Sequence, residues 1–170
     1  MWKHTGQKRP DFAVAPGPDQ ESVWDYPRPP VLVSTDEVVV VGAPDAPIAR
    51  TRSALRVLET ASPPTYYIPE TDIDWSQLRA IPNHSFCEWK GQASYFALLD
   101  DPRDRAVAWL YANPSASFAA IDRHVSFYPA RVECWVNGER VRPQAGGFYG
   151  GWITDRLVGP FKGEPGTGHW

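Results

Sequence analysis

The sequence predicts a mainly β protein with one or two short helices. It contains 8 Trp, 7 Tyr and 7 Phe, and large rings favour strands. It also contains 18 Pro and 13 Gly, which end regular elements early and mark turns. With 170 residues, 42% of them hydrophobic, the chain has the size of one domain and enough apolar side chains for a core.

Composition divides this single predicted domain, residues 1–170, into three parts. Residues 1–30 contain six prolines and should form an extended arm, although Trp24 and Tyr26 indicate that the arm docks on the body. Residues 31–142 are expected to form a β-rich body. Residues 143–170 are rich in glycine but are interleaved with large apolar side chains, so we expect a second arm packed on that body.

The first half of the body should contain a hairpin, further strands and a short helix. The hairpin joins residues 38–41 to 48–50 through a Pro-Asp turn, and residues 66–68 form another strand. Residues 54–59 fit either a strand or a helical turn. Asp74 and Gln77 resemble a capping box, which predicts a short helix through Arg79, followed by a loop over Pro82 and Asn83.

The second half predicts two hairpins and the best helix candidate. Strands over 85–89, 93–99 and 106–111 are separated by Lys90-Gly91 and by an Asp-rich turn. After Pro114, apolar residues at 118, 121 and 125 share one helical face, which predicts a helix ended by Pro129. Asn137-Gly138, a strong hairpin signal, separates strands over 133–136 and 139–141.

Charge and hydropathy argue against nucleic-acid and membrane partners. The net charge is only −3, and the basic residues are scattered, so we expect no nucleic-acid partner. No apolar stretch approaches the 18 or so residues of a membrane span, and the N-terminal residues lack the apolar region of a signal peptide. We therefore expect no membrane partner and a cytoplasmic protein, whose two cysteines remain thiols.

No cofactor or metal is predicted. The glycine-rich run at 146–151 matches neither dinucleotide nor phosphate loops, and common serine hydrolase and zinc protease motifs do not occur. His84 and Cys87 have a plausible ligand spacing. However, His124 and Cys134, the other candidate ligands, are isolated rather than paired as in a zinc knuckle.

The candidate site combines charged groups with aromatic walls. Arg52 and Lys90 would serve as charge partners for a small polar or anionic molecule, and Glu59 as an orienting group or base. The walls would come from four aromatic residues, Tyr67, Trp89, Tyr95 and Trp109. The alternative is that Arg52 and Glu59 form a structural ion pair and that the rings pack an ordinary core.

Thiol chemistry is a second hypothesis. Cys87 precedes Lys90 by three residues, and a nearby cation favours the nucleophilic thiolate. On a continuous strand the two side chains would face opposite sides, so the idea requires Lys90 to lie in the turn. The alternative is a buried, inert Cys87 and an exposed Lys90. Cys134 has no comparable neighbour and is expected in the core.

Three segments resemble the family called domain of unknown function 427, which some classifications label nucleotidyltransferase-like. They are Thr51–Thr60, with its Arg-Val-Leu-Glu run, Pro63–Pro69, and Cys87–Tyr95, with Cys-Glu-Trp-Lys-Gly. The similarity extends to Tyr128. It implies a β-tent fold, in which two antiparallel sheets meet at an angle.

Three functions follow as hypotheses. The first is a protein that binds a small polar or anionic metabolite in an aromatic-lined pocket. The second is an enzyme that uses Cys87, Lys90 and Glu59. The third is a non-enzymatic assembly protein, a homo-oligomer whose two terminal arms contact a neighbouring subunit.

Overall fold

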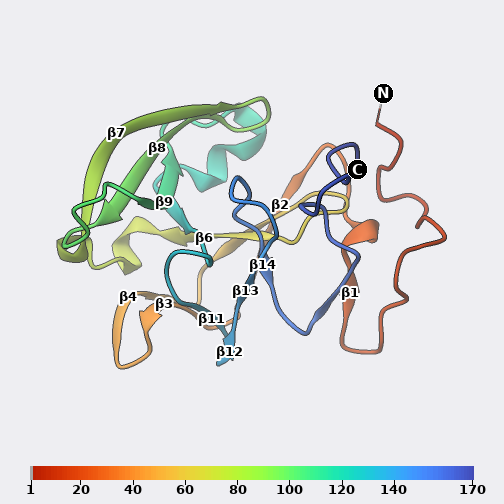
Figure 1. The fold of residues 1–170 in the computed structure, drawn as a ribbon, viewed down its shortest axis with the longest axis horizontal. Coiled ribbons are helices and arrows are strands. Elements are labelled where there is room, and N and C mark those ends of the chain that lie inside the picture. Colours follow the sequence, from red (N-terminus) through yellow and green to blue (C-terminus); the bar gives the residue numbers. More distant parts are fainter. Residues whose placement is uncertain (1) are drawn as a thin grey trace.

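The computed structural model describes residues 2–170 and is mainly β (Figure 1). Its strands are β1 (Glu21–Ser22), β2 (Val31–Ser34), β3 (Val39–Ala43), β4 (Ala46–Thr51), β5 (Leu55–Leu58), β6 (Thr65–Pro69), β7 (Leu78–Cys87), β8 (Gly91–Leu98), β9 (Ala106–Tyr111), β10 (His124–Phe127), β11 (Cys134–Val136), β12 (Glu139–Arg140), β13 (Arg142–Pro143), β14 (Trp152–Ile153) and β15 (Leu157–Val158). The helices of residues 2–170 are short 3-10 helices: η1 (Val23–Asp25), η2 (Glu70–Asp72), η3 (Trp75–Gln77) and η4 (Ala116–Ile121).

Two large antiparallel sheets form the body. One has seven strands in the order β2-β5-β6-β10-β9-β8-β7, and the other has four in the order β12-β11-β3-β4. Two-stranded sheets, β1-β15 and β13-β14, lie in the terminal arms. The prediction of a mainly β fold with antiparallel sheets is confirmed.

Most predicted hairpins are present. Lys90 lies in the turn between β7 and β8, where Cys87 pairs with Gly91. Asn137 and Gly138 join β11 to β12 with φ values of 48° and 81°, the left-handed backbone that this dipeptide tolerates. The ambiguous segment 54–59 contains a strand, β5, rather than a helical turn.

The predicted helix after Pro114 is wrong beyond Ile121. Arg123 has a φ of 59°, which ends the 3-10 helix, and Val125 and Phe127 then enter strand β10. Both side chains are buried there. The apolar residues that suggested one helical face therefore belong to two elements: Phe118 and Ile121 to the helix, and Val125 to the strand. None of the helices in residues 2–170 has the length and apolar character needed to cross a bilayer.

The predicted loop at Pro82-Asn83 is also wrong. Strand β7 runs through both residues, with an irregular register between Ile81 and His84. Because β7 is an edge strand, proline at this point need not donate a ladder hydrogen bond. The preceding helix ends at Gln77, and Arg79 already belongs to the strand.

The seven-stranded sheet has two different faces. Successive side chains on a strand alternate in direction, and Tyr66 and Tyr67 show this on β6. Tyr66 packs with Val39, Val41 and Phe127 in the core shared with the four-stranded sheet. Tyr67 lies in a separate aromatic cluster on the opposite face.

The terminal arms contact each other as well as the body, and one buried cluster combines Trp24, Leu157 and Ala61. Trp24 is fully buried, and its indole N–H donates to the carbonyl of Pro160 over 3.0 Å. Trp152, also fully buried, donates in the same way to Phe127 of β10. Glu21 pairs with Leu157 where β1 and β15 run parallel. That all three parts unfold as one unit stays a prediction.

Candidate functional site

The second face of the seven-stranded sheet carries a cluster of aromatic side chains. Tyr67, Trp109 and Tyr111 form its buried floor, because less than a tenth of each is exposed. The side chains packed against this floor at its partly exposed margin include Cys87, Trp89, Tyr95 and Tyr128. Alternation along β8 and β9 places Tyr95, Trp109 and Tyr111 on one face, since Tyr95 pairs directly with Trp109.

The floor is a continuous row of rings. The Tyr67 ring lies 6.4 Å from Tyr111 and 6.3 Å from Trp109, between ring centroids, and Trp109 lies 4.5 Å from Tyr128. The indole N–H of Trp109 donates to the Tyr67 hydroxyl over 3.1 Å. Burial raises the pKa of Tyr67 and of Tyr111, so both phenols stay protonated.

Lys90 lies at one end of this row. Its ammonium nitrogen is 5.7 Å from the ring centroid of Tyr111 and 5.7 Å from that of Phe118 on η4. Ser115 fixes the turn, because its backbone N–H donates to the Lys90 carbonyl over 3.2 Å and its hydroxyl donates to the Trp89 carbonyl. Within residues 2–170 no carboxylate forms an ion pair with Lys90.

Arg131 lies at the other end of the row. The central carbon of its guanidinium is 4.4 Å from the ring centroid of Tyr128. The guanidinium donates to the backbone carbonyls of Ala106, over 2.6 Å, and Gly147, over 3.3 Å. No sequence motif marks Arg131, because its connection to Trp109 runs through Tyr128.

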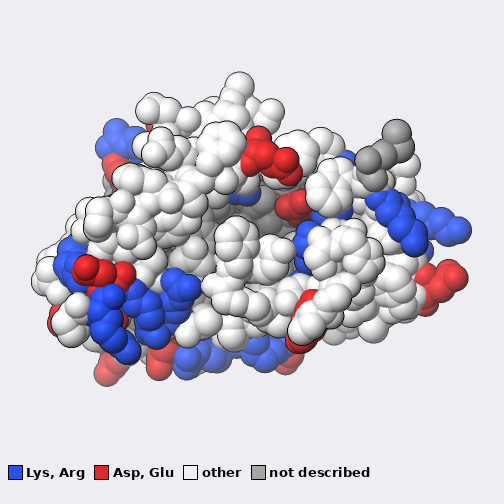
Figure 2. Space-filling view, turned by 45° about the horizontal axis from the view of Figure 1, so that its top comes forward, with Lys and Arg blue, Asp and Glu red and all other residues white. Residues whose placement is uncertain are grey.

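The C-terminal arm forms a wall of the cluster at Gly150. A Cβ atom at this position would lie 2.3 Å from the outer edge of the Trp109 ring, so only glycine allows this approach. Figure 2 shows a hollow on this side of the molecule, between the part that carries β7 and β8 and the part that carries the chain ends. Basic and acidic side chains both lie at its edges.

Two predicted site residues do not join the aromatic cluster. Arg52 is exposed, and its side chain makes none of the hydrogen bonds or ion pairs found within residues 2–170. Glu59 accepts from the buried Arg28 over 3.2 Å, on the side where the N-terminal arm docks. The suggested ion pair between Arg52 and Glu59 is therefore absent from the described residues, and Arg28 takes its place.

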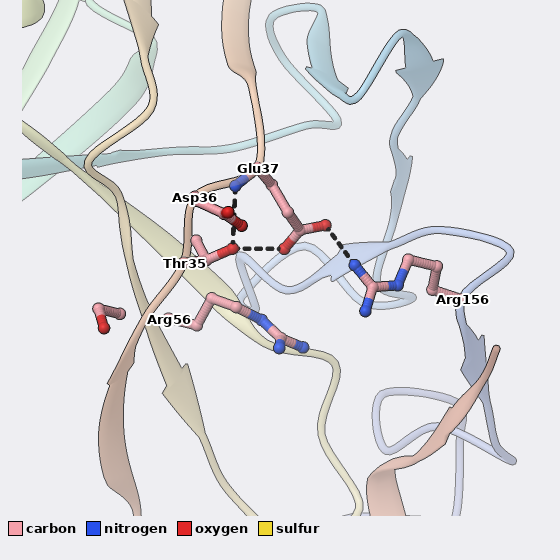
Figure 3. A pocket seen from close by; sticks show the side chains of 6 residues that line it. Thr35, Asp36, Glu37, Arg56 and Arg156 are labelled. Atoms are coloured by element: carbon pink, nitrogen blue, oxygen red, sulfur yellow. Dashed lines mark hydrogen bonds and ion pairs between the residues drawn. The ribbon is translucent and has the colours of Figure 1, made fainter.

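A second group of polar side chains, missed by the sequence analysis, lies where both arms meet the body (Figure 3). Glu37 is buried and accepts from the Tyr66 hydroxyl over 3.1 Å and from Arg156 over 3.0 Å. Arg56 makes two hydrogen bonds to Glu21, of 3.2 and 2.9 Å. These residues come from distant parts of the chain, so sequence spacing carries no signal of their proximity.

This polar group borders a pocket of about 450 Å³. Its lining residues are Ser34, Thr35, Asp36, Glu37, Arg56 and Arg156. The Nε–H of Arg56 is buried beside it and has no acceptor within residues 2–170. An unpaired buried donor of this kind costs about 1–3 kcal/mol.

The candidate metal ligands are dispersed. Cys134 is fully buried in the core between the two sheets, whereas His84 is exposed on the edge strand. Among residues 2–170 no three His, Cys, Asp or Glu side chains are grouped so that they could hold a metal ion.

Comparison with known families agrees with the resemblance noted above. The family described as Domain of unknown function (DUF427), named NTP_transf_9, matches residues 31–138. This range covers well over half of the chain and includes every aromatic residue of the row. No curated protein matches the chain. The protein therefore belongs to the DUF427 family.

Proposed function

We propose that the protein binds a small polar or anionic metabolite over the aromatic face of the seven-stranded sheet. Lys90 would pair with an anionic group of the ligand, and the rings of Trp89, Tyr95 and Tyr128 would contact its body. The observation that carries this proposal is the position of Lys90, held over two rings at the cluster margin without a carboxylate partner within residues 2–170.

The energetics favour a ligand at this position. A cation over an aromatic ring gains only about 0.5–1 kcal/mol at an exposed site. A charge-assisted hydrogen bond contributes about 1.5–3 kcal/mol. The Lys90 ammonium therefore retains most of its capacity to bind an anion. Small-molecule sites commonly combine apolar walls with a few such polar groups.

Arg131 supports the same proposal from the opposite end of the row. Its guanidinium contacts two carbonyls and a ring, and none of the ion pairs within residues 2–170 involves it. A ligand with a flat body would lie along the rings, with cations at both ends. Arg52 and Glu59 have no part in this proposal, because neither side chain belongs to the aromatic cluster.

A thermal-shift screen of organic acids and other polar metabolites tests the proposal. We expect a ligand whose affinity falls roughly 10- to 100-fold in Lys90→Met, since each 1.4 kcal/mol is a factor of ten. Lys8→Met, which removes an exposed lysine from the N-terminal arm, should leave affinity unchanged. The proposal is wrong if no compound binds, or if Lys90→Met binds as tightly as the parent chain.

Thiol chemistry at Cys87 is the second candidate function. It is favoured by one observation: Cys87 is partly exposed and lies in the same cluster that Lys90 borders. The proposal that Cys87 acts as a nucleophile needs an accessible thiol whose reactivity depends on Lys90.

Labelling with a thiol reagent at neutral pH should modify one of the two cysteines in the folded chain. Cys134 is fully buried, and burial raises the pKa of its thiol, so it should react only after unfolding. Cys87 should react in the native state, and more slowly in Lys90→Met. An unreactive Cys87, or a rate that Lys90→Met does not change, would remove the second candidate function.

A further inference from the structure

The pocket bordered by Arg56 and Arg156 lies apart from the aromatic cluster. Arg56 is next to Val57 on β5, and alternation places the two side chains on opposite faces of the sheet. Val57 belongs to the aromatic cluster, whereas Arg56 lies over the ring of Tyr66 in the shared core. The pocket volume of about 450 Å³ is in the range of small-molecule sites.

The pocket offers unused donors. The Arg156 side chain is half exposed, and within residues 2–170 only one of its nitrogens makes a hydrogen bond, to Glu37. Its second terminal nitrogen lies 3.7 Å from Glu21, beyond hydrogen-bond distance. Arg56 also lines the pocket, and its buried Nε–H has no acceptor within residues 2–170.

The pocket also offers an unused carboxylate. Asp36 is exposed, and within residues 2–170 its carboxylate makes no hydrogen bond or ion pair. Figure 3 shows Asp36 and the two guanidinium groups around one space. Asp36 comes from the β2–β3 loop, Arg56 from β5 and Arg156 from the C-terminal arm. Opposite charges with spare bonding capacity therefore line the same cavity.

This arrangement selects against ligands of a single charge. A simple anion near Arg156 would also meet the carboxylates of Asp36 and Glu37, and a simple cation near Asp36 would meet both arginines. A ligand with both charges can satisfy the two sides at once. We propose that this pocket binds a free α-amino acid, whose carboxylate pairs with Arg156 and whose ammonium group pairs with Asp36.

Isothermal titration calorimetry of the full chain with each of the common amino acids tests this inference. We expect at least one to bind with a dissociation constant of about 1 mM or tighter. For that amino acid, the analogue without the amino group and the analogue with a carboxamide should each bind at least about tenfold more weakly, because each loses one charge pair.

Variants locate the binding. Asp36→Asn and Arg156→Gln should each weaken it by about tenfold or more, the equivalent of one charge-assisted contact. Asp45→Asn, at the exposed β3–β4 turn, and Lys90→Met, in the aromatic site, should leave it unchanged. The inference is overturned if no amino acid binds, if the deaminated analogue binds equally well, or if Asp36→Asn has no effect. These outcomes are independent of ligand binding at the aromatic site.

Discussion

Replacing Trp24 by alanine should lower the free energy of unfolding by about 3–5 kcal/mol. The indole is fully buried and forms ring contacts with Phe12 and Trp170, whose centroids lie 5.1 and 5.2 Å away. The substitution would leave a cavity between the two arms and the Pro160 carbonyl without its donor. Urea unfolding followed by circular dichroism measures the loss.

Trp75→Ala is the matched control. Trp75 is 37% exposed, and its indole N–H donates to the Glu70 carbonyl over 3.0 Å, so we expect a loss near 1 kcal/mol. The same experiment tests the single-domain prediction, since one cooperative transition should lose stability as a whole. A Trp24→Ala chain that is as stable as the parent would show that the arms do not stabilise the body.

Replacing Arg56 by methionine should lower the free energy of unfolding by about 2–4 kcal/mol. This loss is somewhat below the usual range for breaking a buried ion pair, because Glu21 is partly hydrated. The Arg56 side chain is 10% exposed and that of Glu21 is 33% exposed. The change leaves the Glu21 carboxylate without its principal cation. Arg9→Met, which breaks the exposed pair with Asp25, should leave the free energy of unfolding almost unchanged.

The pH dependence of stability provides an independent readout of the same network. Burial by itself would raise the pKa of Glu21, but hydrogen bonds from Arg56 and Tyr26 outweigh it, and the pKa lies below its ordinary value of 4.5. The network therefore contributes its full stability above about pH 4.5 and loses it as the pH falls further.

We expect the free energy of unfolding of the parent chain to fall more steeply below pH 4.5 than that of Glu21→Gln, which has no carboxylate to protonate at this position. The double variant Glu21→Gln/Arg56→Met should recover part of the stability lost in Arg56→Met. Parallel pH profiles, or a double variant without any recovery, would contradict the assigned role of the pair.

Local chemistry in the sequence determined most of the strands and turns. Asn137-Gly138 specifies its hairpin because few other dipeptides adopt two left-handed residues in succession. Period-two alternation predicts strands around Tyr95 and Trp109, and the pairing of these two residues in the folded sheet places both rings on one face. The helix predicted after Pro114 is wrong beyond Ile121 because the prediction used only the spacing of apolar residues. Apolar residues three or four positions apart do not reveal a change of chain direction such as that at Arg123.

The candidate site was predictable where its residues follow one another along the chain. Cys87, Trp89, Lys90 and Tyr95 belong to one hairpin, and the structure brings them to the same cluster margin or turn. Arg52 and Glu59 are also near neighbours in sequence, but strand β5 lies between them in the chain. Glu59 forms its ion pair with Arg28 of the N-terminal arm instead.

Only the tertiary structure decided which distant charges meet. Glu21, Glu37, Arg56 and Arg156 are placed together because both arms fold back over one edge of the body. An ion pair depends on distance in space, and nothing in local sequence reports that distance. The sequence by itself determined the β fold and the aromatic hairpin, whereas the folded chain determined the polar pocket and its partners.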